Sequence, residues 1–221
     1  MKAHPAVLIV VLVSGRGSNL QALIEAQRRG QLDGGHIRAV VSNRPDAFAL
    51  QRARRNGIAT EIVDHRAFAD RDTFDRELLA RVEAHHPELI VLAGFMRLLT
   101  PFFIDRFKGR ILNIHPSLLP EFRGLHTHER ALEAGVKQHG CSVQFVNEDL
   151  DTGPVIIQAK VAIHPGDDAS RLAARVLRCE HMIYPLAVRW FCEGRLEQVG
   201  DQVFLDSAPL REPLMLDERE A

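Results

Sequence analysis

The sequence has little cysteine and almost no excess charge, and both shortages exclude classes of protein. Its 221 residues include only three cysteines, at positions 141, 179 and 192, and no CxxC pair. Neither a disulfide scaffold nor a cysteine-bound zinc is therefore expected. Lys and Arg number 28 against 29 Asp and Glu, so a general basic surface for nucleic acid or membrane binding is not expected either. With 46% hydrophobic residues, the chain has an ordinary globular composition. Because cysteine is scarce, we expect a cytoplasmic location.

Long hydrophobic runs are also missing. No stretch approaches the roughly 20 apolar residues that a membrane-spanning helix needs. The run at 6–13 has the length of the apolar part of a signal peptide, but no small-residue cleavage pattern follows it. It leads instead into the polar turn at 14–19 and then an amphipathic segment, a context typical of a buried parallel strand.

Strand-like and helix-like patterns alternate over the first two thirds of the chain. Strands are predicted at 6–13, 37–43, 60–64, 88–94 and 110–115, and helices at 18–29, 45–56 and 70–86. Later, strands at 142–149 and 154–163 are separated by a short turn, and a helix at 168–193, a small hairpin and a charged tail follow.

This order predicts an α/β, Rossmann-like fold. Strands spaced by helices form a mostly parallel sheet with helices on both faces. The later strands, which only a short turn separates, should add an antiparallel pair at the C-terminal side. No repeat or linker interrupts the pattern, so we expect one domain over residues 1–221.

The turn SGRGSN at 14–19 follows the first predicted strand and is a candidate phosphate site. Its glycines allow a tight backbone, and the next helix offers unpaired N–H groups to an anion. Leu20 replaces the third glycine of the dinucleotide fingerprint, and the second strand ends in Ser42-Asn43 without the acid that holds an NAD ribose. A monophosphate fits better than a dinucleotide, and a plain structural turn is the alternative.

The segment NIHPSLLP at 113–120 suggests acyl-transfer chemistry. Asn113 and His115 are two residues apart at the end of an apolar strand, so their side chains project to the same side. Strand carboxyl ends form the ligand crevice of an open parallel sheet. There an amide can donate to an oxyanion and an imidazole can move a proton. Alternatively, Asn113 binds loop backbone and His115 packs beneath the loop.

The third candidate is the acidic turn DLDTGP at 149–154. A carboxylate close to His115 would orient the imidazole and favour its charged form. Asp and Gly at a turn also serve turn geometry alone, so this alternative stays open. The pair His126 and His128 does not have a convincing zinc spacing, and we expect exposed residues at a helix start and no metal site.

Together these motifs resemble those of the folate-dependent formyltransferases. The segments NxHPSLLP at 113–120 and LDxGP at 150–154 are typical of that superfamily. The segments SGxGSN at 14–19, LAGFMR at 92–97, GLHTH at 124–128 and EHxxYP at 180–185 are similar to the members that formylate glycinamide ribonucleotide (GAR). The similarity runs from the first strand to the long C-terminal helix.

The resemblance implies that the co-substrate 10-formyltetrahydrofolate gives its formyl group to the amine of GAR in de novo purine biosynthesis. It implies small-molecule partners only, no metal, and a monomer or homodimer. The catalytic residues would be Asn113, His115 and Asp151. The GAR-binding residues would be Gly17, Ser18, Asn19, Leu177, Arg178, Cys179 and Glu180. The folate-binding residues would be Arg71, Met96, Arg97, Leu98, Leu99, Asn113, Asn147, Glu148, Asp149, Leu150 and Asp151.

On this basis residues 1–110 form a phosphate- and GAR-binding half, and residues 111–221 a folate-binding and catalytic half. Two departures from related sequences stand out. Arg16 occupies a position where some relatives carry a smaller polar residue, and the run Leu177-Arg178-Cys179 also differs.

Four other functions fit parts of these motifs. Formyltetrahydrofolate deformylases use water in place of the amine, carry an extra N-terminal domain and read His-His-Ser-Phe where this chain has His115-Pro116-Ser117-Leu118. Methionyl-tRNA formyltransferases carry a C-terminal nucleic-acid-binding extension, for which this length leaves no room. A nicotinamide oxidoreductase and a non-catalytic nucleotide sensor are both disfavoured by the missing acid after the second strand and by the Asn, His and Asp set.

Overall fold

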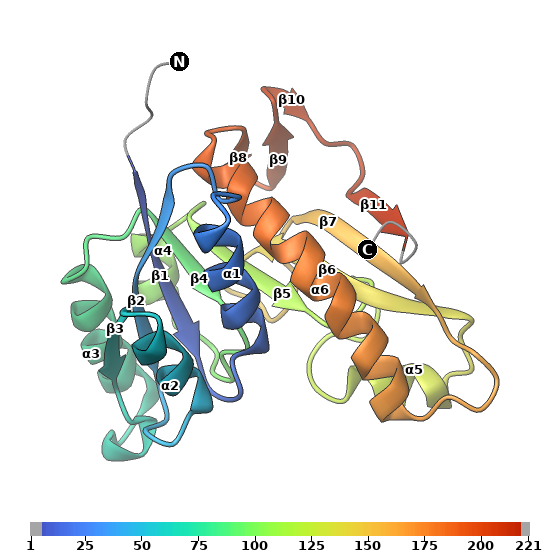
Figure 1. The fold of residues 1–221 in the computed structure, drawn as a ribbon, viewed down its shortest axis with the longest axis horizontal. Coiled ribbons are helices and arrows are strands. Elements are labelled where there is room, and N and C mark those ends of the chain that lie inside the picture. The colour runs from blue at the N-terminus through green and yellow to red at the C-terminus, as the bar shows by residue number, and fades with distance from the viewer. Residues whose placement is uncertain (1–5, 218–221) are drawn as a thin grey trace.

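The computed structural model describes residues 6–217 and contains one eight-stranded sheet that runs through both halves of the chain (Figure 1). In spatial order the strands are β11 (Leu214–Asp217), β7 (Val155–Ala162), β6 (Gln138–Phe145), β5 (Ile111–His115), β4 (Leu89–Leu92), β1 (Val7–Val13), β2 (Gly35–Ser42) and β3 (Ala59–Ile62). Strands β5, β6 and β7 pair antiparallel, and the remaining neighbours pair parallel. The predicted α/β fold class is confirmed.

Helices cover both faces of this sheet. They are α1 (Ser18–Arg28), α2 (Phe48–Arg55), α3 (Arg71–Glu83), α4 (Pro101–Arg106), α5 (Thr127–Glu133) and α6 (Ala169–Cys192). Side chains of α1, α2 and α6 belong to one buried apolar cluster, whereas those of α3 and α4 belong to a second cluster on the opposite face. Figure 1 shows α6 crossing in front of the sheet beside α1.

Strand β1 explains why the sheet forms at the centre of the molecule. Ile9, Val11 and Val13 pack into the cluster under α1 and α6, while Val10 and Leu12 pack into the cluster under α3 and α4. Because successive side chains of a strand point to opposite faces, a continuous apolar run is what a strand buried on both sides requires. The expectation of a buried parallel strand at this run is therefore confirmed.

Most predicted elements have bounds that differ by a few residues, and contacts explain two of these differences. Helix α2 begins at Phe48, not at residue 45, because residues 44–47 form a turn that Ser42 Oγ holds by donating to the Arg44 carbonyl at 2.8 Å. Strand β6 covers Gln138–Phe145 instead of 142–149, since its first residues pair with the end of β7. Residues 146–154 then form a loop longer than the short turn expected.

The C-terminal region contains more structure than the sequence predicts. The expected hairpin is formed by β8 (Leu196–Val199) and β9 (Gln202–Leu205), and β10 (Ala208–Pro209) extends it to a three-stranded sheet. Strand β11 was not predicted, and it adds a parallel edge to β7. None of the helices over residues 6–217 combines the length and hydropathy that a bilayer span requires.

The side chain of Tyr184 anchors α6 to the centre of the sheet. It is fully buried, and its hydroxyl lies 2.9 Å from the Leu92 carbonyl and 3.0 Å from the Leu112 carbonyl. Leu92 is the last residue of β4, at the carboxyl edge where ligands bind in open α/β sheets, and Leu112 lies on the neighbouring strand β5. The contact therefore fixes the long helix against the edge of the sheet that carries the candidate site.

Replacing Tyr184 with Phe should remove this anchor without changing the packing volume. We expect the free energy of unfolding to fall by about 1–2 kcal/mol, because the single hydroxyl hydrogen that the two buried carbonyls share is lost. Urea denaturation of the two proteins measures the difference, and equal midpoints and slopes would contradict the assigned role.

Candidate active site

A cavity of ≈ 700 Å³ opens at the carboxyl ends of β4 and β5. Four segments line it: the loop after β4, the end of β5, the segment 124–129, and the loop that follows β6. The three predicted catalytic residues all line this cavity, and so do Met96, Arg97, Leu98, Leu99 and residues 147–151. Of the predicted folate-binding residues, only Arg71 is outside the cavity lining; it lies exposed at the start of α3.

His115 and Asp151 form a buried ion pair at the wall of the cavity. The His115 Nδ1 atom lies 3.3 Å from Asp151 Oδ2, and both side chains are 7% exposed. On the other side of the ring, Nε2 lies 3.0 Å from the backbone carbonyl of Phe122. Both ring nitrogens thus face acceptor oxygens, and only the doubly protonated imidazolium presents a hydrogen to each of them.

The Asp151 carboxylate is held from three sides. Besides His115, it accepts a hydrogen bond from the Gly124 backbone N–H at 2.9 Å and one from Gln144 Nε2 at 3.3 Å. Its own backbone is left-handed, with φ of 52°. Nearby, a Cβ on Gly153 would lie 1.8 Å from the Phe145 carbonyl oxygen, so only glycine lets the loop return this closely to β6.

Asn113 differs from its two partners in being free to bind a ligand. It lies half-buried on β5, where it pairs in register with Gln144 of β6, and it lines the cavity. Among the described residues, no hydrogen bond uses its side-chain amide. A free amide beside a fixed imidazole is the arrangement that stabilises a developing oxyanion.

Sequence reasoning missed Gln144, which holds Asp151 from the neighbouring strand. Ser142 and Gln144 alternate on β6 opposite His115 and Asn113. Polar side chains at alternate positions of an otherwise apolar strand are the signal that could have predicted the place of Gln144 in this cavity. The Phe122 carbonyl and the Gly124 N–H, which contact His115 and Asp151, belong to loop backbone. The residue types in the sequence therefore do not predict these contacts.

His128 is not the exposed helix-start residue that was expected. It is half-buried, and its Nδ1 lies 3.2 Å from Nε2 of the buried His139. Burial lowers the pKa of both rings, and it lowers that of His139 to about 4. His139 is therefore neutral near pH 7 and packs edge-on against the Phe122 ring, next to the carbonyl that His115 contacts.

The predicted phosphate turn has the geometry that its glycines suggested. Gly17 has φ of 71°, and a Cβ there would lie 2.6 Å from Ala49 Cβ of α2. Ser14 connects this turn to the cavity, because its hydroxyl donates to Asn43 Oδ1 at 2.6 Å and accepts from the Met96 N–H at 2.7 Å. The turn and the loop after β4 are thus parts of one hydrogen-bonded unit.

The predicted GAR-binding residues fall into two groups. Asn19 Nδ2 donates to Glu180 Oε2 at 2.6 Å, and burial raises the pKa of that carboxyl. These two residues join the start of α1 to α6, and their contact with GAR stays a prediction. Leu177, Arg178 and Cys179 line neither the cavity nor the groove between α1 and α6, and Cys179 is 1% exposed in the core.

Residues on both sides of position 110 contribute to the cavity and to the contacts of the phosphate turn. Residues 96–99 come from the first half and line the cavity, whereas Glu180 comes from the second half and contacts the phosphate turn. Over residues 6–217, no group of three or more His, Cys, Asp or Glu side chains could hold a metal ion.

Comparison with known proteins shows which family this chain is similar to. Residues 7–188 match the formyl transferase family. The phosphoribosylglycinamide formyltransferase of Escherichia coli is 52% identical over 91% of this chain and 95% of its own length. The solved structure of the phosphoribosylglycinamide formyltransferase from Coxiella burnetii has a TM-score of 0.91 and 48% identity, covering 96% of this chain and 99% of that one. The chain belongs to the formyl transferase family.

Within the formyl transferases, a deformylase provides the useful contrast. A formyltetrahydrofolate deformylase from Pseudomonas syringae has the same fold, with a TM-score of 0.83, but only 25% identity over 92% of this chain and 67% of that one. The identity of 52% to the Escherichia coli enzyme therefore groups this formyltransferase with those of GAR, as its motifs predict.

Replacing His139 with Gln should reduce the loss of stability in acid. The folded-state pKa of about 4 lies below the ordinary 6.5, so the unfolded chain takes up this proton first as the pH falls. As the pH falls from about 6.5 to about 4, the free energy of unfolding of the wild type therefore decreases. Protonation of His139 in the unfolded chain accounts for roughly 2–4 kcal/mol of this decrease. Gln does not titrate, so urea midpoints measured across that range should decline less steeply. Parallel declines of the two proteins would contradict this assignment.

Proposed function

We propose that this formyltransferase moves the formyl group of 10-formyltetrahydrofolate to the amine of GAR, with Asn113, His115 and Asp151 as the catalytic residues. The observation that carries the proposal is the buried His115–Asp151 pair beside the free Asn113 amide in one cavity. We further propose that the protein works in the cytoplasm, without a metal and as a single domain, and as a monomer or homodimer.

The reaction exchanges one C–N bond for another. The GAR amine attacks the formyl carbon, a tetrahedral intermediate with a negatively charged oxygen forms, and the bond to the folate nitrogen then breaks. One proton leaves the attacking amine and one reaches the departing folate nitrogen, so the net transfer is balanced. The protein's tasks are to stabilise the oxyanion and to move this proton.

Asn113 and His115 are suited to the first task. The amide of Asn113 has no hydrogen-bond partner among the described residues, so it can donate to the oxyanion without breaking a contact. An imidazolium at His115 places positive charge in a site that is largely shielded from water. Charge stabilisation is stronger in such surroundings than in bulk solvent.

Asp151 is suited to the second task. Its Oδ2 atom contacts the His115 ring, while Oδ1 receives only the long contact from Gln144 at 3.3 Å. A carboxylate in this position keeps the imidazole charged and oriented, and can accept the amine proton directly or through a water molecule.

The apolar wall of the same cavity fits the pterin ring of the folate. Met96, Leu98, Leu125 and Leu150 all line it, although their side chains are between 49% and 68% exposed. Exposed large apolar side chains gathered around a cavity are typical of a ligand site. Arg97 lies over the Phe74 ring, and its buried Nε atom has no hydrogen-bond partner among the residues that the structure describes.

We assign Arg97 and Arg71 to the carboxylates of the folate tail. Both guanidinium groups interact with Asp75, whose pKa is nevertheless raised by burial. The two cations therefore lie close to one another at this end of the molecule. Guanidinium groups pair well with carboxylates through two parallel hydrogen bonds.

Replacing Asn113 with Ala should lower kcat about 10²- to 10³-fold, because one oxyanion donor is lost. The dissociation constant for GAR should change little, and that for the formyl donor should rise far less than kcat falls, since the strongest contact of the amide forms in the transition state. Single-turnover kinetics with calorimetric binding separates the two effects. A variant that turns over normally would remove Asn113 from the catalytic set.

Replacing Asp151 with Asn should keep the shape of the side chain and remove its charge. We expect kcat to fall by about 10²- to 10⁴-fold, as it does when an orienting carboxylate beside a catalytic histidine becomes an amide. Circular dichroism and calorimetric folate binding serve as controls for folding and for an intact cavity. Near-normal turnover would contradict the role of the carboxylate.

The identity of the acceptor is tested by supplying 10-formyltetrahydrofolate with and without GAR. Folate deformylation should require GAR and should yield one formylated GAR for each folate released, as measured by absorbance and chromatography. Equal deformylation without GAR would show that water is the acceptor and would favour a hydrolase.

A further inference from the structure

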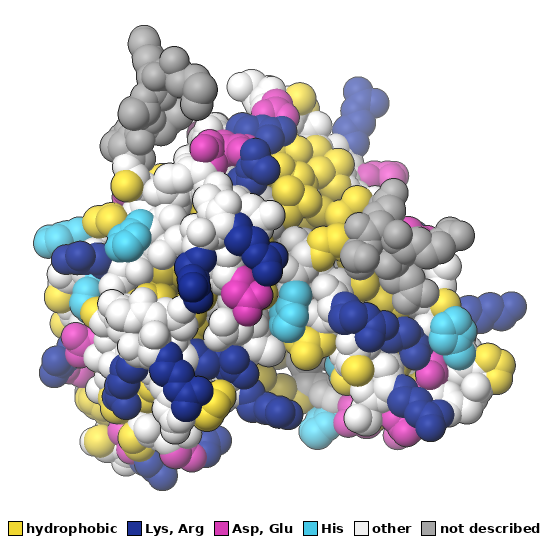
Figure 2. All heavy atoms as spheres, in the orientation of Figure 1, with side chains coloured by type: hydrophobic (Ala, Val, Ile, Leu, Met, Phe, Trp, Pro, Cys, Tyr) yellow, Lys and Arg dark blue, Asp and Glu magenta, His cyan; other side chains and the backbone are white. Residues whose placement is uncertain are grey.

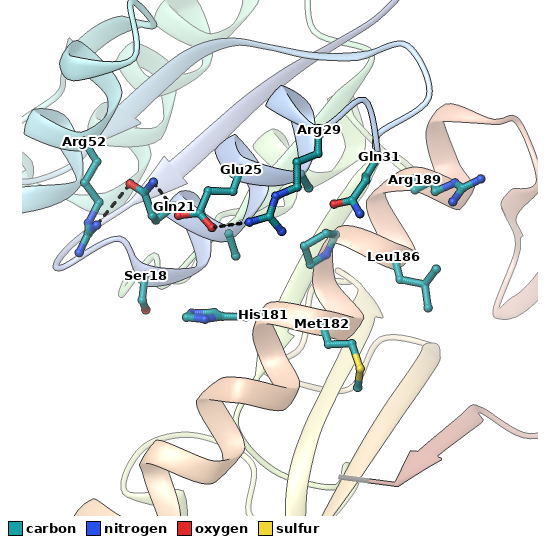
Figure 3. A pocket seen from close by; sticks show the side chains of 13 residues that line it. Ser18, Gln21, Glu25, Arg29, Gln31, Arg52, His181, Met182, Leu186 and Arg189 are labelled. Carbon is teal, nitrogen blue, oxygen red and sulfur yellow. Dashed lines mark hydrogen bonds and ion pairs between the residues drawn. The ribbon is translucent and has the colours of Figure 1, made fainter. Parts of the chain in front are cut away.

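The segment between β4 and α4 forms one wall of the ≈ 700 Å³ cavity, which we call the donor cavity. Residues 94–99 all line it, and they contain no helix or strand. Among the described residues, no backbone–backbone hydrogen bond uses residues 95–99. The groove of ≈ 590 Å³ between α1 and α6 (Figure 3) takes none of its lining from this segment. Contacts of side chains must therefore set the position of this wall.

Apolar packing decides which side of the segment faces the donor cavity. Phe95 and Leu99 pack with the buried cluster under α3 and α4. Met96 and Leu98 stay 67% and 49% exposed at the cavity. Apolar burial is not directional, so it leaves the exact position of the backbone to hydrogen bonds.

Ser14 holds the segment at its amino end. The Ser14 hydroxyl accepts a hydrogen bond from the Met96 N–H at 2.7 Å and donates one to Asn43 Oδ1 at 2.6 Å. The Ser14 N–H also donates to the Gly94 carbonyl at 3.1 Å. Ser14 and Asn43 are only 4% and 2% exposed, and a hydroxyl can donate and accept at once. The start of the segment is therefore tied to the residues that follow β1 and β2.

Asp75 of α3 holds the segment at its carboxyl end. Charged side chains of this protein lie mostly at the surface, as Figure 2 shows for one face, but Asp75 is fully buried. Its Oδ2 accepts a hydrogen bond from the Thr100 N–H at 2.5 Å, and its charge interacts with that of Arg97. Because a buried carboxylate is costly unless it is paired, its place beside this segment indicates a specific role there.

We propose that Ser14 and Asp75 are positioning residues for the formyl donor, which hold segment 96–100 in the conformation that binds it. The proposal rests on the donor cavity being the site of 10-formyltetrahydrofolate. Neither residue lines that cavity, so both act through the backbone of the segment and not by contact with the donor.

The effect on binding follows from the order of the wall. A wall that is fixed before the ligand arrives loses little conformational entropy on binding. A segment that adopts the binding conformation only part of the time has an affinity reduced by that fraction. Loss of either contact should therefore weaken donor binding while the chemical step, once the donor is bound, stays nearly as fast.

Replacing Asp75 with Leu should raise the KM for the donor about 10-fold, the effect of losing one buried hydrogen bond. The kcat and the KM for GAR should stay close to those of the wild type. Asp75→Asn should recover most of the loss, because its amide oxygen can still accept from the Thr100 N–H. The matched control is Glu83→Gln, which removes a carboxylate of the same helix that pairs with Arg106 of α4 at the surface and should behave as wild type.

Replacing Ser14 with Ala tests the other end of the segment and should also raise the donor KM about 10-fold. Arg29→Gln, which removes an exposed ion pair with Glu25 in the groove between α1 and α6 (Figure 3), should leave it unchanged. A smaller folded fraction would lower the apparent kcat without raising the donor KM. That result in Ser14→Ala and Asp75→Leu would show a structural role only and would overturn the proposal.

Calorimetric titration with tetrahydrofolate separates this proposal from the assignment of the reaction. The wild type should bind tetrahydrofolate about 10-fold more tightly than Ser14→Ala and Asp75→Leu, whether or not formyl transfer occurs. A wild type that binds tetrahydrofolate but does not formylate GAR would count against the proposed function alone. Variants that bind as tightly as a wild type that formylates GAR would count against the positioning role alone. A wild type that does not bind tetrahydrofolate would overturn both.

Discussion

The arrangement of the site depends on the ion pair between His115 and Asp151, which come from opposite sides of one strand pairing. His115 is the last residue of β5, and Asp151 lies in the loop that leaves β6. The antiparallel register that sets Asn113 against Gln144 and His115 against Ser142 decides where this loop begins. A shift of one residue would turn Asn113 and His115 to the opposite face of the sheet. The chemistry therefore depends on a backbone register as much as on the side chains.

Two further contacts connect the elements around this pair. Tyr184 holds α6 to the carbonyls of β4 and β5, and through that helix it positions Glu180 against Asn19. Ser14 joins the phosphate turn to the loop after β4. The proposed acceptor and donor sites thus share their supports, which suits a reaction whose two substrates must meet within bonding distance.

Much of this organisation follows from the sequence because it depends on local patterns. The apolar run at 6–13, the alternation of helices and strands, and the spacing of Asn113 and His115 all predict what the structure contains. The resemblance to folate-dependent formyltransferases added Asp151 to this set, and the structure places it 3.3 Å from His115. The polar turn at 14–19 likewise adopts the left-handed backbone that its glycine allows.

What the sequence did not predict depends on tertiary contacts. Strand β11 forms because the edge of β7 is available, and α2 starts late because Ser42 holds the preceding turn. His128 is half-buried because β6 places His139 beside it, and the partners of Asp151 include a backbone N–H that no residue type reveals. For Cys179 the sequence predicted a role that the side chain is not placed to fill. Its position in a binding motif suggested contact with GAR, but its side chain is buried in the core.

The most direct test of the central claim is a crystal structure with GAR and a 10-formyltetrahydrofolate analogue that cannot transfer its group. The formyl oxygen should lie within about 3.2 Å of the Asn113 amide nitrogen, with the GAR amine facing the formyl carbon and Asp151 still in contact with His115. A formyl oxygen directed away from Asn113 and His115, or an Asp151 carboxylate separated from the imidazole in this complex, would contradict the account.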